Sequence, residues 1–417
     1  MQISEIQSKK LDLELINIKL IQREKSPPIT IIAKGTLKQD EHGVIQLTAN
    51  SLTNDYPNFT QNEFNSVGFI KPEHEYFDLY ATDHNGVNWK AERLGLKNNI
   101  NDKSNLFATV TMIKRDIQIS NNVAEFKSIM CFSSTNLRPN KIYVKIGKSM
   151  ALINIKSDFV EVFIQSESSD LIDKISNCIY KPISMLLGKQ ICPISSELYV
   201  LEGASQKIYS KNNDIDSQSL FPILGYYYNN EDAKNFIESY VRKLELEFEN
   251  NDSVFPRWHD SLMTNRRSIH SGLYSCSAQI EGLIDSYFQT MFEKDDRDYL
   301  TSLDGIIEAV ESIEKCEARE HALSRLSSMK RKSPSTVAVE ICNKIAISTK
   351  LAKTWSKVRN KKLHSTVMEY DNATLKKDML RMHMCHYFMY RLIFEIIGYK
   401  GHCVDYSKEG FPIVKVE

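Results

Sequence analysis

Apolar and polar positions alternate over short runs in roughly the first 170 residues, and these runs are rich in β-branched and aromatic side chains. Such alternation predicts β-strands, because every second side chain of a strand points to the same face. Turn signals such as DEHG, DHNG and NNIND separate the runs. The predicted strands are residues 29–37, 43–49, 75–83, 87–94, 105–113, 141–147 and 159–166. Their rhythm favours an antiparallel sandwich or a barrel-like domain.

The apolar period changes to a helical one at residues 170–188, where Pro182 interrupts the pattern and Gly188 closes it. A mixed stretch follows, and from Asp232 to near Lys400 the pattern is helical again. The predicted helices there are residues 231–250, 255–265, 269–293, 297–329, 334–350, 352–367 and 373–397.

Two of these helices carry further signals. Ser333 is the predicted N-cap of the helix that begins at Pro334, the position that favours proline. The helix 373–397 ends in the very apolar run YFMYRLIFEIIG, so we expect it in a bundle core or a subunit interface.

The two patterns together predict an α+β protein of two domains. A β-rich domain would span residues 1–228, including the helix near 170–188, and an all-α bundle would span residues 229–417. The length agrees, since 417 residues exceed the size at which one core usually stops growing.

Composition narrows the cellular setting and the class of function. The net charge is +0, so the chain as a whole is not a generic polyanion binder. None of the 8 cysteines falls in a C-x-x-C pair, which favours reduced thiols over a disulfide framework. The first residues lack a signal-peptide pattern, and no apolar run is long enough for a membrane span. We therefore expect a cytoplasmic protein without membrane contact.

Charge is unevenly shared within the helical region. Residues 281–317 contain 11 acidic and 3 basic residues, whereas residues 319–400 contain 17 basic and 6 acidic ones. Solvated helix faces and a nucleic-acid footprint both fit such a basic stretch.

The basic stretch contains WSKVRNKKLHST, residues 355–366, in which Arg359 and Asn360 precede His364. Arginine can bind phosphate oxygens with its planar fork, and histidine can serve as a general acid or base. These are the groups that RNA cleavage by the 2′-hydroxyl needs, and no metal cofactor is required. On a straight helix Arg359 and His364 lie about 140° apart, so they converge only at a distorted helix end or with help from a second subunit. By spacing alone, an ordinary basic surface remains the commoner explanation.

The segment VRNKKLHST resembles the Arg-polar-x3-His signature of HEPN domains. The upstream SGLYSCSAQIEGLIDSYF, residues 271–288, looks like the HEPN helix that carries an acidic residue facing this signature, with Glu281 as the candidate. IIGYKGHCVDYS is similar to the ending of ApeA-like HEPN proteins, and IIAKGTLKQDEHGVIQLTA resembles the opening hairpin of the ApeA N-terminal domain.

The resemblance implies an effector of abortive anti-phage defence, whose HEPN domain cuts cellular RNA without a metal or other cofactor. It makes Arg359 and His364 the catalytic pair, with Asn360 and Glu281 as helpers. It also implies a homodimer or higher homo-oligomer, an RNA substrate with transfer RNA as the leading guess, and a trigger that a phage supplies. The alternative is a non-catalytic HEPN protein that binds RNA or a partner.

Other side chains are candidates for supporting roles. RNA contacts are expected from basic residues beside the motif and before the helix at 334, namely Lys361, Lys362, Lys330, Arg331 and Lys332. A zinc site among His383, Cys385, His386, His402 and Cys403 is the less favoured alternative to packing, since no second close pair completes a tetrahedral set.

Overall fold

The computed structural model describes residues 11–40, 43–52, 72–98, 104–117, 124–131, 140–156, 159–166, 168–200, 203–210, 221–243, 253–265, 268–294, 296–361 and 372–417. The chain divides into two compact units, one of residues 1–180 and 190–217, the other of residues 181–189 and 218–417. The first is dominated by antiparallel sheet and the second by helices, which confirms the predicted α+β class. The observed division assigns residues 218–228 to the helical unit, whereas the boundary expected from the sequence follows residue 228.

Strands of the first unit pair in the order β10-β11-β12-β9-β13-β14-β8-β5-β4-β1-β2-β3-β7-β6. They are β1 (Asp12–Gln22), β2 (Thr30–Gln39), β3 (Ile45–Ser51), β4 (Phe77–Asp83), β5 (Asn88–Leu94), β6 (Lys97–Asn98), β7 (Asn105–Val110), β8 (Met112–Ile117), β9 (Ala124–Cys131), β10 (Asn140–Ile146), β11 (Ser149–Ile155), β12 (Phe159–Ser166), β13 (Cys192–Val200) and β14 (Gly203–Tyr209). Each strand that was expected has a counterpart, with the expected strand 105–113 covering β7 and only the start of β8. The strands that were not expected are β1, β6, β9, β11, β13 and β14.

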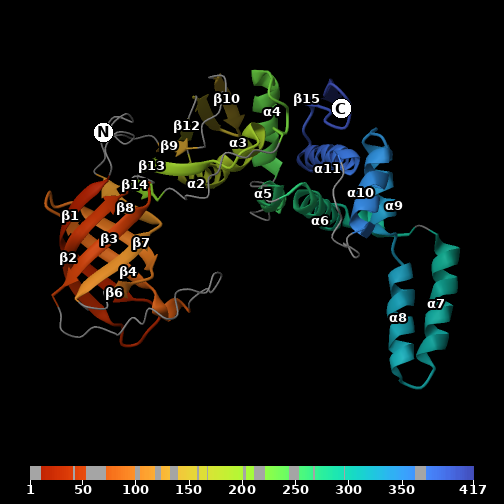
Figure 1. Cartoon of the computed structure of the whole chain (residues 1–417), viewed down its shortest axis with the longest axis horizontal. Helices are drawn as coiled ribbons and strands as arrows, with labels where there is room; N and C mark the ends of the chain where they lie inside the picture. The colour runs from red at the N-terminus through yellow and green to blue at the C-terminus, as the bar shows by residue number, and fades with distance from the viewer. Residues whose placement is uncertain are drawn as a thin grey trace. The chain divides into compact units, whose positions relative to one another are not determined.

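The strands β1 to β5, β7 and β8 form a closed ring. β3 pairs with β7, and Thr111 alone separates β7 from β8, which pairs with β5. Since β5, β4, β1, β2 and β3 also pair in sequence, the circuit is complete, as the red and orange strands of Figure 1 show. The first part of this unit is therefore barrel-like, of the two architectures that the rhythm of strands allowed.

Alternate side chains of these strands fill the ring. Buried residues from β1, β2, β3, β4, β5, β7 and β8 form one apolar cluster, which includes Leu20, Ile31, Leu47, Phe77 and Leu106. Gly35 is needed where β2 pairs with β3, because a Cβ atom there would lie 2.1 Å from the carbonyl oxygen of Thr48.

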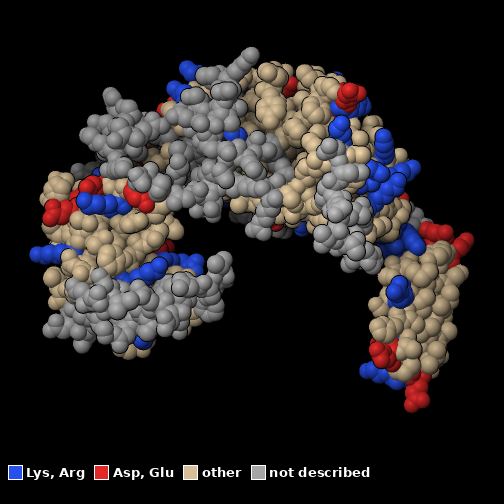
Figure 2. Space-filling model, viewed as in Figure 1, with Lys and Arg blue, Asp and Glu red and all other residues tan. Residues whose placement is uncertain are grey.

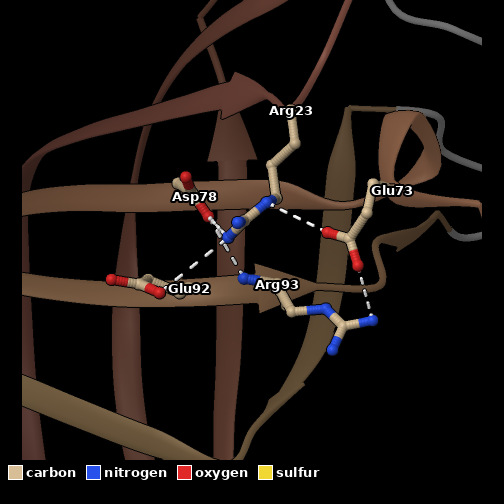
Figure 3. A network of polar contacts seen from close by, with 5 residues as sticks. All are labelled: Arg23, Glu73, Asp78, Glu92 and Arg93. Carbon is tan, nitrogen blue, oxygen red and sulfur yellow. Dashed lines mark hydrogen bonds and ion pairs between the residues drawn. The ribbon is translucent and has the colours of Figure 1, made fainter.

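A network of charges lies beside this ring (Figure 3). The Arg23 guanidinium lies 3.2 Å from Glu73, 2.9 Å from Asp78 and 3.9 Å from Glu92. Arg93 lies 2.7 Å from Glu73 and donates its main-chain N–H to Asp78. The network joins the end of β1 to β4, β5 and the short helix η2 (Glu73–Glu75). Ion pairs that stay in contact with solvent, as these partly exposed ones do, add little free energy each, so the network chiefly fixes how these segments meet.

The remaining strands extend the sheet from β8 through β14, β13, β9, β12 and β11 to β10. Helix α2 (Ser169–Cys178) packs against β9 and β12 through Ile172 and Ile175. The expected helix 170–188 is in fact two helices, because the chain turns at Ile179 and continues as α3 (Tyr180–Leu187), whose residues from Lys181 onward belong to the other unit.

The second unit consists of helices and a small hairpin. Its elements are α4 (Asn230–Tyr240), α5 (Val254–Asn265), α6 (Ile269–Tyr287), η4 (Gln289–Phe292), α7 (Arg297–Glu311), α8 (Glu317–Met329), α9 (Pro334–Lys344), α10 (Lys350–Lys361), α11 (Asn372–Ile397), β15 (Gly401–Val404) and β16 (Ile413–Val416). The expected cap is confirmed, since the Ser333 hydroxyl accepts the N–H of Thr336 at the start of α9. Among the described residues, no helix has the length and apolar character needed to cross a bilayer.

Helix α11 lies in the core of the bundle, one of the two places expected for it. It packs against α6 and α10, and α6 also packs against α5 and α9. Phe388, Leu392 and Ile393 on α11 have no exposed surface. The apolar run at the end of this helix is thus explained by burial within the unit.

The expected single helix 297–329 is wrong. The chain turns between Ser312 and Cys316, so α7 and α8 form a helical hairpin that projects from the other helices of its unit (Figure 1). At its base Glu293 and Arg331 form an isolated β-bridge, and the N–H of Lys332 donates to the carbonyl of Phe292 at 2.8 Å.

The hairpin of β15 and β16 is tied to the start of α4 by one buried carboxylate. Asp232 accepts the main-chain N–H of His402 at 3.0 Å and faces His402 Nδ1 at 3.3 Å. It also accepts a hydrogen bond from the Asn229 side-chain amide at 2.6 Å. The buried charge therefore has several partners, as burial of a carboxylate requires.

Candidate active site

Helix α10 is held against the bundle by one apolar face. Leu351, Ala352, Trp355 and Val358 are buried at the spacing of a helix face. The indole N–H of Trp355 donates to the main-chain carbonyl of Ser277 on α6 at 2.9 Å. This hydrogen bond fixes the position of α10 along α6.

One turn beyond Trp355, Arg359 meets Glu281. Its Nε and Nη2 atoms donate to the two carboxylate oxygens of Glu281 at 2.7 and 2.6 Å. The guanidinium carbon also lies 5.9 Å from the centre of the Trp355 ring. Both side chains of the pair are 31% exposed, so they lie at the edge of the bundle, open to solvent. The structure thus brings together two of the residues that the sequence singled out; their part in catalysis stays a prediction.

The rest of the motif follows Arg359 directly. Asn360 is exposed, and α10 is described as far as Lys361. His364 and Lys362 lie outside the described residues.

Basic side chains line the outer face of the same helix. Lys350, Lys353 and Lys357 are exposed at helical spacing, opposite the buried face. Figure 2 shows Lys and Arg side chains gathered over α9 and α10. This part of the basic stretch is therefore a surface and is open to a polyanion.

The charges around Glu281 influence one another. Burial raises the pKa of the Asp285 carboxyl, and the negative charge of Glu281 acts in the same direction. The positive charges of Arg359, Arg331 and Arg257 oppose this rise in the pKa of Asp285. Two carboxylates and three guanidinium groups thus share this part of α6 and its neighbours.

The three basic residues before α9 each have a partner within the protein. Lys330 lies 2.6 Å from Asp304, and Lys332 lies 3.0 Å from Glu340. The Arg331 guanidinium lies 4.9 Å from the centre of the Phe292 ring. These contacts hold the base of the α7–α8 hairpin, and any contact of the three residues with RNA stays a prediction.

The residues weighed as zinc ligands face different surroundings. His383 packs between the rings of Phe221 and Phe411, with ring centres 4.9 and 5.5 Å away. His386 is fully buried, and burial lowers its pKa to about 4. In the described part of the chain, no three His, Cys, Asp or Glu side chains come close enough to hold a metal ion.

Sequence reasoning missed Arg257 of α5, whose side chain lies across α6 next to Glu281. A Cβ atom on Gly282 would lie 1.7 Å from Nη1 of this arginine. One signal could have pointed there, because a glycine inside a helix costs about 1 kcal/mol relative to alanine and often marks a close approach.

Comparison of the chain with protein-family models, with curated proteins and with solved structures gave no match.

Proposed function

We propose that this protein is an endoribonuclease of the HEPN type, with Arg359 and His364 as its catalytic pair. The observation that supports this most is the two-oxygen ion pair between Arg359 and Glu281. It joins the arginine of the motif to the acidic residue that the resemblance selects, and it fixes the guanidinium at the end of an exposed basic helix.

RNA cleavage by the 2′-hydroxyl needs two proton transfers and one positively charged group that binds the phosphate. The 2′-oxygen of a ribose attacks the neighbouring phosphorus while its proton passes to a base, and the bond from phosphorus to the 5′-oxygen breaks as that oxygen gains a proton. The products are a 2′,3′-cyclic phosphate and a 5′-hydroxyl. His364 would serve as the acid or the base, Arg359 would hold the phosphate oxygens, and Asn360 would orient one of these groups.

A second copy of the chain would complete the site. Residues five apart on a regular helix point about 140° away from each other, so Arg359 of one copy would work with His364 across a two-fold axis. Light scattering tests this step: a monomer at every working concentration with full activity would rule the shared site out.

For the biological role, we propose abortive defence against phage. The support is the resemblance of both halves of the chain to ApeA-like proteins. The β-rich unit would restrain the nuclease or recognise a phage component, and transfer RNA is the first substrate to test.

A non-catalytic role is the second candidate, and one observation favours it. Glu281 occupies the Nε–Nη2 edge of Arg359, one of the two edges with which the guanidinium could bind a phosphate. If Glu281 never releases Arg359, the basic helix would bind RNA or a partner without cutting.

The deciding experiment compares wild type, His364→Ala and His321→Ala, the last being an exposed histidine on α8 that serves as the control. We expect wild type and His321→Ala to cleave RNA to 2′,3′-cyclic ends in the presence of a chelator and to arrest growth on infection, whereas His364→Ala does neither. Equal cleavage by His364→Ala would rule out the nuclease proposal, and RNA binding without cleavage by wild type would support the second candidate.

A further inference from the structure

Arg257 reaches the site from a different helix than the motif does. It leaves α5 and runs across Gly282 of α6, where Nη1 and the guanidinium carbon would lie 1.7 and 2.3 Å from an added Cβ. Its Nη2 donates to the Ser286 hydroxyl at 3.2 Å. The missing side chain at Gly282 is thus what lets this guanidinium lie flat on α6.

The two arginines border the same stretch of α6. Glu281, which Arg359 binds, and Gly282, which Arg257 covers, are adjacent and point about 100° apart on the helix. Asp285 projects about 40° from Glu281, between the two. The electrostatic influence of both arginines on Asp285 agrees with this arrangement.

Arg257 has hydrogen-bond donors that its contact with Ser286 does not use. A guanidinium has five N–H donors, and Ser286 takes one of them. Nε is buried without a hydrogen-bond partner in the part of the chain that the structure describes, so an RNA phosphate would have to use the donors on Nη1 and Nη2. With Arg331 also near Asp285, three arginines face two carboxylates, which leaves an excess positive charge for an anion.

We propose that Arg257 binds a phosphate of the RNA strand next to the phosphate that Arg359 holds, and that Gly282 exists to make room for it. This inference rests on the proposed ribonuclease function and adds a binding residue on a second helix. The guanidinium groups of Arg257 and Arg359 lie against neighbouring residues of α6, so together they would bind the RNA backbone on both sides of the cleaved bond. Such contacts carry no sequence preference, so they would serve single strands of any sequence.

The test measures binding of a short fluorescein-labelled polyuridylate to full-length His364→Ala protein by fluorescence anisotropy over a range of salt concentrations. Each phosphate contact contributes about 0.7 to the slope of log affinity against log salt for a single strand. We expect Arg257→Ala to reduce the slope by about that amount and Arg257→Lys to restore it. Lost packing alone would weaken binding without this change in slope.

A substitution at Gly282 would move the guanidinium of Arg257 without removing it, and the same substitution at Gly305 is its control. Gly282→Ala forces the mobile end of Arg257 aside, whereas Gly305→Ala adds the same methyl group in α7, where nothing lies within 4 Å. We expect Gly282→Ala to reduce the salt slope as Arg257→Ala does, and Gly305→Ala to leave it unchanged. Both proteins should melt at or above the temperature of the parent protein, because alanine favours helix more than glycine does.

The outcomes separate this inference from the proposed function. An unchanged slope in Arg257→Ala and Gly282→Ala, with cleavage by the wild type intact, overturns the role of Arg257 alone. A His364→Ala parent that does not bind RNA, together with a wild type that does not cut it, overturns the ribonuclease proposal and the inference with it.

Discussion

Trp355 and Ser277 lock α10 onto α6: the indole N–H of one donates to the main-chain carbonyl of the other at 2.9 Å, and both residues are buried. One turn further along each helix, Arg359 meets Glu281. The hydrogen bond of Trp355 therefore fixes how α10 is aligned along α6, and this alignment brings Arg359 to Glu281.

Replacing Trp355 with Phe should destabilise the protein by about 1–3 kcal/mol, because the carbonyl of Ser277 would lose the indole donor and the smaller ring would fill its fully buried place less well. Urea unfolding measures this free energy. Ser277→Ala is the matched control, since its hydroxyl is buried without a partner in the described structure, and its removal should be neutral or stabilising. Equal losses in the two variants would contradict the role given to the indole.

Replacing Glu281 with Ala should lower kcat for RNA cleavage by about tenfold to a hundredfold, because Arg359 would lose the carboxylate that orients it. Glu281→Gln retains one acceptor oxygen and should fall between the wild type and Glu281→Ala. Single-turnover cleavage at saturating enzyme measures this effect separately from binding. A rise in RNA affinity with unchanged or faster cleavage would instead identify Glu281 as a restraint on Arg359.

Acid should destabilise the helical unit through His386. Burial holds the pKa of this histidine at about 4 in the folded protein, against 6.5 for an ordinary histidine. Between these pH values the unfolded chain binds a proton that the folded chain does not, so the free energy of unfolding falls as the pH drops from 7 toward 4. The loss attributable to His386 is at most about 3 kcal/mol.

Unfolding at pH 7 and pH 5 measures this dependence. His386→Phe should reduce it, whereas His321→Gln, at an exposed position on α8, should leave it as in the wild type. An identical pH dependence in His386→Phe would show that other groups cause the loss.

Removing the carboxylate of Asp232 should loosen the hairpin of β15 and β16. Asp232→Ala would leave the N–H of His402 and the side chain of Asn229 without their acceptor, at a cost of about 1–3 kcal/mol. Thermal unfolding and exchange of the His402 amide check this. Glu231→Ala is the control, because that neighbouring carboxylate is exposed and should change stability little.

Local signals explain why much of the fold could be predicted. Ser333 and Pro334 mark the start of α9 within the sequence itself, and the apolar run of α11 is continuous. The signal fails for β1, because a bulge between Leu15 and Ile18 shifts its alternation. Closure of the ring through Thr111 depends on pairing between distant strands, which no local pattern contains.

In the candidate site, too, some residues could be predicted from the sequence and others could not. Glu281 and Arg359 could be selected because each stands in a recognisable segment, and the structure brings them together. Arg257 and Gly282 are 25 residues apart on two helices. Their contact depends on how α5 crosses α6, a property of packing that the spacing of residues along one helix does not encode.

The α7–α8 hairpin has a consequence for how this protein unfolds. Within it Leu303 alone is fully buried, while Ile306 and Ile313 are more than half exposed. A pair of helices with so little burial should open locally, well below the temperature at which the α11 core melts. The bridge between Glu293 and Arg331 would open with it, so the charge balance near Asp285 should depend on temperature while the bundle is still folded.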